Sequence, residues 1–159
     1  MAPAHSQDRT DGRIDGAEEL LALTEELIRS VLTARGHRPE PGTPLRLTSP
    51  AGTTLLVRPG RAGSRLEVEI RLTAAFSIPD IPRLYGFCNA WNHDRFWPSA
   101  YVEVGDRGTV GVRGASVTDL PYGVAPHQLA RLLERALAAG DELARAAAGL
   151  DPSSSRQAR

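Results

Sequence analysis

Residues 65–72, RLEVEIRL, constrain the fold more than any other stretch of the sequence. Apolar and charged side chains alternate there without exception. Successive side chains of a β-strand point to opposite faces of a sheet, so this pattern predicts a strand with one buried and one solvent-facing side. Antiparallel sheets commonly have one packed and one solvated face. The chain is therefore expected to contain an antiparallel sheet.

Two shorter apolar stretches precede this strand and predict its partners. LRLTS (45–49) and TTLLVRP (53–59) flank the turn residues 50–52, and a second, looser turn covers residues 58–64. β-branched and leucine-rich segments bounded by Gly, Pro and Ser are typical of hairpins. Residues 38–72 are thus expected to form a three-stranded meander.

The first helix is predicted upstream of this meander. Asp15 is suited to the N-cap position, with Glu18 three residues later as in a capping box, and Gly36 supplies a stop. Apolar residues recur between them at helical spacing, at Leu20, Leu23, Leu27 and Val31. This pattern predicts a helix of about five turns.

A second helix is expected over residues 81–92, with Asp80 as its cap and Pro82 in the first turn, where proline is tolerated. SAYVEV (99–104) predicts a strand and residues 105–108 a tight hairpin. In the returning strand, 109–117, the apolar phase shifts, which predicts a bulge near Gly114. The last helix is expected to begin near Pro126 and to continue past Gly140 toward Leu150.

The resulting order is α-βββ-α-ββ-α. It indicates an α+β fold with helices packed on an antiparallel sheet. One domain is expected over residues 15–150. The polar, aperiodic ends, residues 1–14 and 151–159, predict disordered tails.

Composition excludes several function classes. All 19 basic residues are arginine, which rules out lysine nucleophiles, Schiff bases and the P-loop. No apolar run reaches the ~18 residues of a membrane span, residues 1–16 lack a secretory apolar segment, and a single cysteine suits a reducing compartment. We expect a soluble cytoplasmic protein with no membrane partner. Glu67 and Glu69 offset the arginine excess of residues 37–72, so no nucleic-acid partner is expected.

The stretch FCNAWNHDRFW (87–97) holds the only cysteine and both tryptophans. Cys88 shares a helix face with Leu84 and Trp91, which favours a packing role. A nucleophilic pair of Cys88 with His93 is the alternative. No histidine or cysteine has the spacing of a metal site. We predict no catalytic residue, no metal ligand and no cofactor.

Three residues are candidates for partner binding: Trp97, Tyr101 and Arg113. Trp97 and Tyr101 share a parity opposite to that of Val102 and so are predicted on the solvent-facing side of the sheet. Arg113 belongs to the paired strand. Aromatic residues and arginine are enriched at binding hot spots. The alternative is that these residues only pair with one another.

The region 66–148 resembles bacterial YbjN-domain proteins, especially those of actinobacteria. The resemblance rests on a helix that ends in an N-x-W-N signature, an aromatic residue and a proline before the next strand, and the start of the last helix; these fall on Asn89, Trp91, Asn92, Phe96, Pro98, Tyr101, Gly123, Val124 and Leu129. Ala125 departs from the pattern, since many members place a Ser or Asp cap there. The resemblance implies a type III secretion chaperone-like fold and a small, often dimeric domain that binds other proteins.

These observations favour a noncatalytic protein-binding domain, chaperone-like or regulatory, that forms a homodimer and contacts a further, unknown protein. A small-molecule or nucleotide-sensing regulatory domain is the first alternative. A thiol-dependent enzyme that uses Cys88 is the second.

Overall fold

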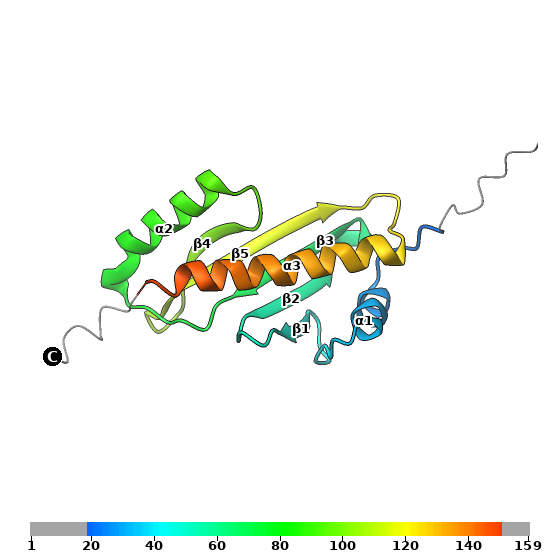
Figure 1. Cartoon of the computed structure of the whole chain (residues 1–159), viewed down its shortest axis with the longest axis horizontal. Coiled ribbons are helices and arrows are strands. Elements are labelled where there is room, and N and C mark those ends of the chain that lie inside the picture. The colour runs from blue at the N-terminus through cyan, green and yellow to red at the C-terminus, as the bar shows by residue number, and fades with distance from the viewer. Residues whose placement is uncertain (1–18, 151–159) are drawn as a thin grey trace, which may run out of the picture.

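One antiparallel sheet organises the computed structural model, which describes residues 19–150 (Figure 1). Its strands are β1 (Leu45–Thr48), β2 (Thr54–Pro59), β3 (Arg65–Arg71), β4 (Ser99–Val104) and β5 (Val110–Asp119). They lie in the order β1-β2-β3-β5-β4. The predicted antiparallel sheet and the meander of β1 to β3 are confirmed. The tails expected at residues 1–14 and 151–159 lie outside the described residues.

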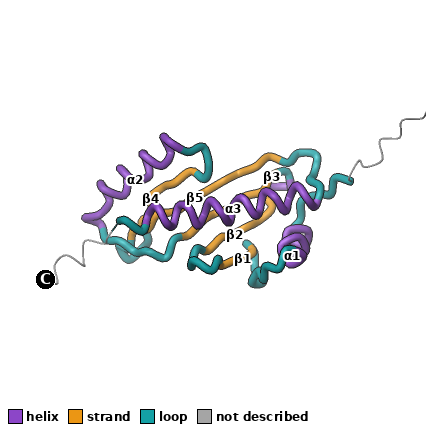
Figure 2. The backbone as a smooth tube through the Cα atoms, viewed as in Figure 1, coloured by secondary structure: helices purple, strands orange, loops and turns teal. Residues whose placement is uncertain are grey.

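Three helices complete the α+β fold (Figure 2). They are α1 (Glu25–Ala34), α2 (Ile81–Asp94) and α3 (Pro126–Ala147), with short 3₁₀ turns η1 (Arg61–Gly63) and η2 (Ile78–Asp80). The predicted order α-βββ-α-ββ-α is confirmed. Figure 1 shows α3 crossing in front of the strands, with α1 and α2 on either side of it.

The first helix is shorter than the leucine spacing predicted. It begins at Glu25, where the side chain of Thr24 accepts a hydrogen bond from the N–H of Leu27 (3.1 Å). The preceding residues form an extended segment instead, since Leu21 and Val124 exchange two backbone hydrogen bonds of 3.1 and 2.9 Å. Tertiary pairing therefore overrides the local helical pattern. The expected cap, Asp15 with Glu18, lies outside the described residues.

The core lies between the helices and one face of the sheet. Leu66, Val68 and Ile70 of β3 are all buried, as the alternation predicted. Above them, α3 approaches the sheet closely at Gly140, where an added Cβ would lie 3.3 Å from Thr53 Cγ2 and 3.4 Å from Ile70 Cγ2. Glycine at this point of α3 thus permits the helix to lie directly on the strands.

The bulge expected near Gly114 is absent, and that prediction was wrong. β5 pairs without interruption with both neighbours, so Gly114 stands opposite Ile70 on one side and Ala100 on the other. Gly114 lies on the helix-facing side, where an added Cβ would lie 3.0 Å from Leu143 Cδ2. The apolar phase appeared to shift only because this side of β5 carries small residues that make room for α3. Ala115 and Val117 consequently lie on the opposite face.

Candidate functional site

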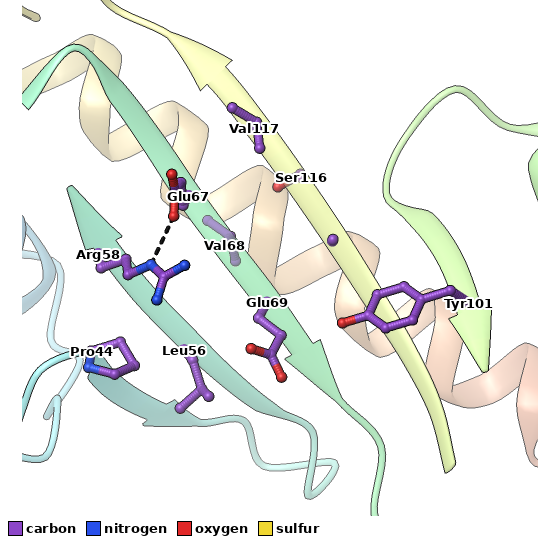
Figure 3. A pocket seen from close by; sticks show the side chains of 10 residues that line it. Pro44, Leu56, Arg58, Glu67, Val68, Glu69, Tyr101, Ser116 and Val117 are labelled. Carbon is purple, nitrogen blue, oxygen red and sulfur yellow. Dashed lines mark hydrogen bonds and ion pairs between the residues drawn. The ribbon is translucent and has the colours of Figure 1, made fainter. Parts of the chain in front are cut away.

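No helix formed by residues 19–150 covers the second face of the sheet. Figure 3 views this face, with the helices behind the strands. Because the parity of each strand is fixed by its register, the central residues on this face are Leu56 and Arg58 of β2, Glu67, Glu69 and Arg71 of β3, Tyr101 and Glu103 of β4, and Arg113, Ala115 and Val117 of β5. We call this set the open face.

A hollow of about 230 Å³ lies in the middle of the open face. Its apolar lining includes Leu56, Ala115 and Val117, and Figure 3 shows Pro44 and Tyr101 on opposite sides of it. No residue of α1, α2 or α3 lines it. The hollow is therefore a property of the twisted sheet itself, and a guest would reach it directly from solvent.

The charges of the open face are arranged as arginine–glutamate pairs. Arg58 donates from Nε to Glu67 (2.7 Å), and Arg71 donates from Nε to Glu69 (2.6 Å). A third pair joins Arg113 Nε to Glu103 (2.8 Å). Pairs this exposed contribute at most about 1 kcal/mol each to stability. Of these six residues, Arg58, Glu67 and Glu69 line the hollow.

Tyr101 and Arg113 lie together, as the sequence predicted. They are directly opposed in the β4–β5 ladder and both belong to the open face. Tyr101 is 39% exposed. Burial of the ring raises the pKa of its hydroxyl, and the negative charges of Glu69 and Glu103 raise that pKa further. The hydroxyl is thus a neutral hydrogen-bonding group at neutral pH.

Trp97, in contrast, does not lie on the open face, and its predicted placement was wrong. It precedes β4 and packs partly buried against the core, with the guanidinium carbon of Arg135 in α3 5.4 Å from its ring centroid. The parity argument failed because Trp97 stands before Pro98, outside the strand. The preceding Phe96 is fully exposed at the turn.

Both edges of the sheet are at least partly occupied. At the β1 edge, the N–H of Glu40 donates to the carbonyl of Arg46 (2.8 Å). At the β4 edge, α2 lies beside the strand (Figure 1), and the amide of Asn92 binds both backbone groups of Ala100, accepting at 2.7 Å and donating at 2.8 Å. A partner is therefore less able to add a strand to either edge than to lie on the open face.

The FCNAWNHDRFW stretch is the corner that ties α2 to β4. Trp91 donates from Nε1 to the carbonyl of Pro98 (2.8 Å), and Asn92 holds Ala100. Arg95 stacks over the Trp91 ring, 4.3 Å from its centroid. The side-chain amide of Asn92 therefore satisfies backbone groups at the junction of helix and strand. Trp91 and Asn92, the residues of the N-x-W-N signature that form these hydrogen bonds, therefore have a structural role.

Replacing Asn92 by leucine is expected to destabilise the fold by about 2 kcal/mol, because the N–H and C=O of Ala100 both lose their partner. Urea denaturation measures the change. Asn89→Leu is the matched control, since Asn89 lies on the exposed side of the same helix, and it should change stability by less than about 0.5 kcal/mol. Equal stability of the two variants would contradict the corner's role.

Cys88 is buried, with 3% exposure, on the face of α2 that also buries Leu84 and Trp91. Burial raises the pKa of its thiol. His93, by contrast, is exposed in the last turn of the helix. A thiol that is inaccessible and protonated at neutral pH is a poor nucleophile, so the arrangement favours packing over thiol chemistry.

We therefore expect native Cys88 to react with a thiol reagent at neutral pH at least about 100-fold more slowly than in the urea-unfolded chain, since only transient opening exposes it. The reagent's chromophore reports the rate. Rapid stoichiometric labelling of the folded protein would contradict the packing role.

Metal-ligating side chains do not converge either. Within residues 19–150, no group of three or more His, Cys, Asp or Glu side chains is placed to hold a metal ion. The same residues contain no helix that is both long and apolar enough to cross a bilayer. The open face, with its hollow, is the site with the clearest potential for binding.

Fold and site together define an α+β domain in which, among the described residues, helices cover one face of the sheet and leave the other open. The YbjN family, described as "putative bacterial sensory transduction regulator", matches residues 24–148. The chain therefore belongs to the YbjN family, and the resemblance seen in its sequence is confirmed at the level of the family. The description places the family among regulatory proteins.

The solved structure of E. coli YbjN supports this fold. The crystal structure of YbjN from E. coli, described as a "putative transcription regulator", superposes with a TM-score of 0.70 at 14% identity and covers 83% of this chain and 97% of its own. An uncharacterized protein from Methanothermobacter thermautotrophicus gives a TM-score of 0.45 at 12% identity, covering 75% of this chain and 92% of its own. A comparison with curated proteins finds no match.

Proposed function

We propose that this chain is a noncatalytic regulatory domain that acts by binding a protein partner through its open face. The observation that carries the proposal is the asymmetry of the sheet. Within residues 19–150, three helices cover one side, whereas the other presents arginine–glutamate pairs and a hollow lined by both apolar and charged side chains. The regulatory description of the family supports the same class.

The composition of the open face suits a reversible protein contact. Val117 is 56% exposed and Tyr101 39% exposed, and both stand among paired charges. An apolar centre surrounded by polar groups is the usual anatomy of an interface. A chaperone-like action would use the same face, since a client segment needs an apolar floor with polar margins.

Affinity capture from the native cell extract tests this function. We expect a defined protein to copurify with the wild-type chain and to be lost with the Tyr101→Ser/Val117→Ser double variant. Tyr122→Ser is the matched control, because Tyr122 is highly exposed and lies outside the open face. Retention of a metabolite in native mass spectrometry, with no protein captured, would favour a ligand-sensing domain instead.

Homodimerisation is a second part of the proposal, and a dimer that pairs two open faces would have to dissociate before another protein binds there. Two open faces are self-complementary in charge, because each carries arginine and glutamate in equal numbers in its three pairs. Light scattering at micromolar concentration is expected to give twice the 17.1 kDa chain mass. A monomer that persists at high concentration would contradict the dimer and leave the face free for another protein.

A further inference from the structure

The polar lining of the hollow is not balanced in charge. Its lining side chains include one guanidinium, Arg58, and two carboxylates, Glu67 and Glu69. Arg58 is bound to Glu67. Glu69 is bound through Oε1 to Arg71, a residue that does not line the hollow. No hydrogen bond from residues 19–150 reaches the second oxygen of Glu69, Oε2, so this carboxylate retains an acceptor for a guest.

Tyr101 supplies a second polar atom at the hollow. Figure 3 shows its ring lying across β5 with the hydroxyl directed toward the side on which Glu69 stands. Within the described residues, the hydroxyl makes no hydrogen bond. Burial of the ring, followed by the negative charges of Glu69 and Glu103, raises the pKa of this hydroxyl, whereas Arg113 and Arg71 lower it, so the hydroxyl stays protonated and can accept a hydrogen bond from a guest.

We propose that the hollow receives a basic side chain, arginine or lysine, of the protein partner. The cationic head would donate hydrogen bonds to Glu69 Oε2 and to the Tyr101 hydroxyl, and the aliphatic stem would pack along β5 against Ala115 and Val117. This inference rests on the proposed function, because it names the chemistry by which the open face recognises its partner.

Other guests fit the lining less well. An acidic side chain would face the two carboxylates, and an apolar one would desolvate Glu69 without replacing its water contacts, which costs free energy. The volume also matters, since about 230 Å³ is below the ~300–1,000 Å³ of pockets that bind drug-sized molecules. A single long side chain matches this size, and cations stack favourably on a tyrosine ring.

Titration with small probes, followed by NMR of the full chain, tests the proposal. The probes are Nα-acetyl-arginine amide and Nα-acetyl-citrulline amide, which have nearly the same shape but differ in charge. We expect saturable shifts at the amides of Tyr101, Ala115 and Val117 with the arginine probe. The citrulline probe should bind at least about tenfold more weakly, as expected for loss of a charge-assisted hydrogen bond.

Two variants test where the cationic group of the probe binds. Glu69→Gln should weaken binding of the arginine probe by about tenfold, since it removes the negative charge. Tyr101→Phe keeps the ring and should weaken binding of this probe less. Glu26→Gln is the matched control on the exposed side of α1 and should leave binding unchanged.

The proposal is overturned if both probes bind equally, if the shifts lie elsewhere, or if Glu69→Gln leaves the affinity unchanged. Such a result is distinguishable from failure of the proposed function. Loss of the captured protein with Tyr101→Ser/Val117→Ser, but not with Glu69→Gln, would mean that the open face binds its partner by other chemistry.

Discussion

Replacing Gly123 by alanine is expected to destabilise the fold by about 3 kcal/mol. Gly123 has φ +91°, a conformation that costs a residue with a Cβ roughly 1–2 kcal/mol. An added Cβ would also lie 2.5 Å from the carbonyl oxygen of Leu21. That oxygen accepts the hydrogen bond from Val124, so the extended segment before α1 would have to move away, at a further cost of about 1–3 kcal/mol for overpacking.

Gly36→Ala separates the two contributions. Gly36 has a similar φ of +81°, but an added Cβ would meet nothing within 4 Å. Its replacement should therefore cost only the conformational part, about 1–2 kcal/mol. Urea denaturation of both variants gives the difference. A Gly123→Ala variant no less stable than Gly36→Ala would contradict the packing of the segment around Leu21 against Val124.

This segment also shows where local sequence patterns stop being informative. The leucines from Leu20 to Leu27 have helical spacing, yet the helix begins only at Glu25. Leu21 is instead paired with Val124, a residue about a hundred positions away, and Leu20 is exposed. Helix propensity and apolar periodicity depend only on neighbouring residues. They therefore cannot predict a backbone pairing with a segment that only the folded chain brings close.

The strands were predictable because their burial follows a pattern between neighbouring residues. In β3 every second residue is apolar, and burial follows that alternation from Leu66 to Ile70. β5 was harder because Gly114 and Ser116 occupy the helix-facing positions. In the sequence, these small residues interrupt the apolar alternation. In the structure, they lie under α3 and allow it to pack closely on β5.

The candidate site was predictable in part. Tyr101 and Arg113 were placed on the open face from parity and from their hairpin, and both lie there. Trp97 was misplaced because parity carries no information beyond the end of a strand. The hollow was not foreseen, since its lining joins Pro44 to residues of β2, β3, β4 and β5, and only the order of strands in space brings these together.

Serine at both Tyr101 and Val117 is expected to weaken partner binding by more than about 2 kcal/mol, the scale of an interface hot spot. That is roughly a thirtyfold rise in Kd. Both side chains line the hollow and are exposed in the free chain, so their replacement should leave the circular dichroism spectrum unchanged. The Tyr122→Ser control should bind as the wild type does.

The Kd of the captured partner for this double variant is the measurement that tests the open face most directly. Isothermal titration with the purified partner provides it for the wild type, the control and the double variant side by side. The account predicts at least a roughly thirtyfold rise for the double variant alone. An unchanged Kd in a folded double variant would contradict it, because the partner would then be bound elsewhere on the molecule.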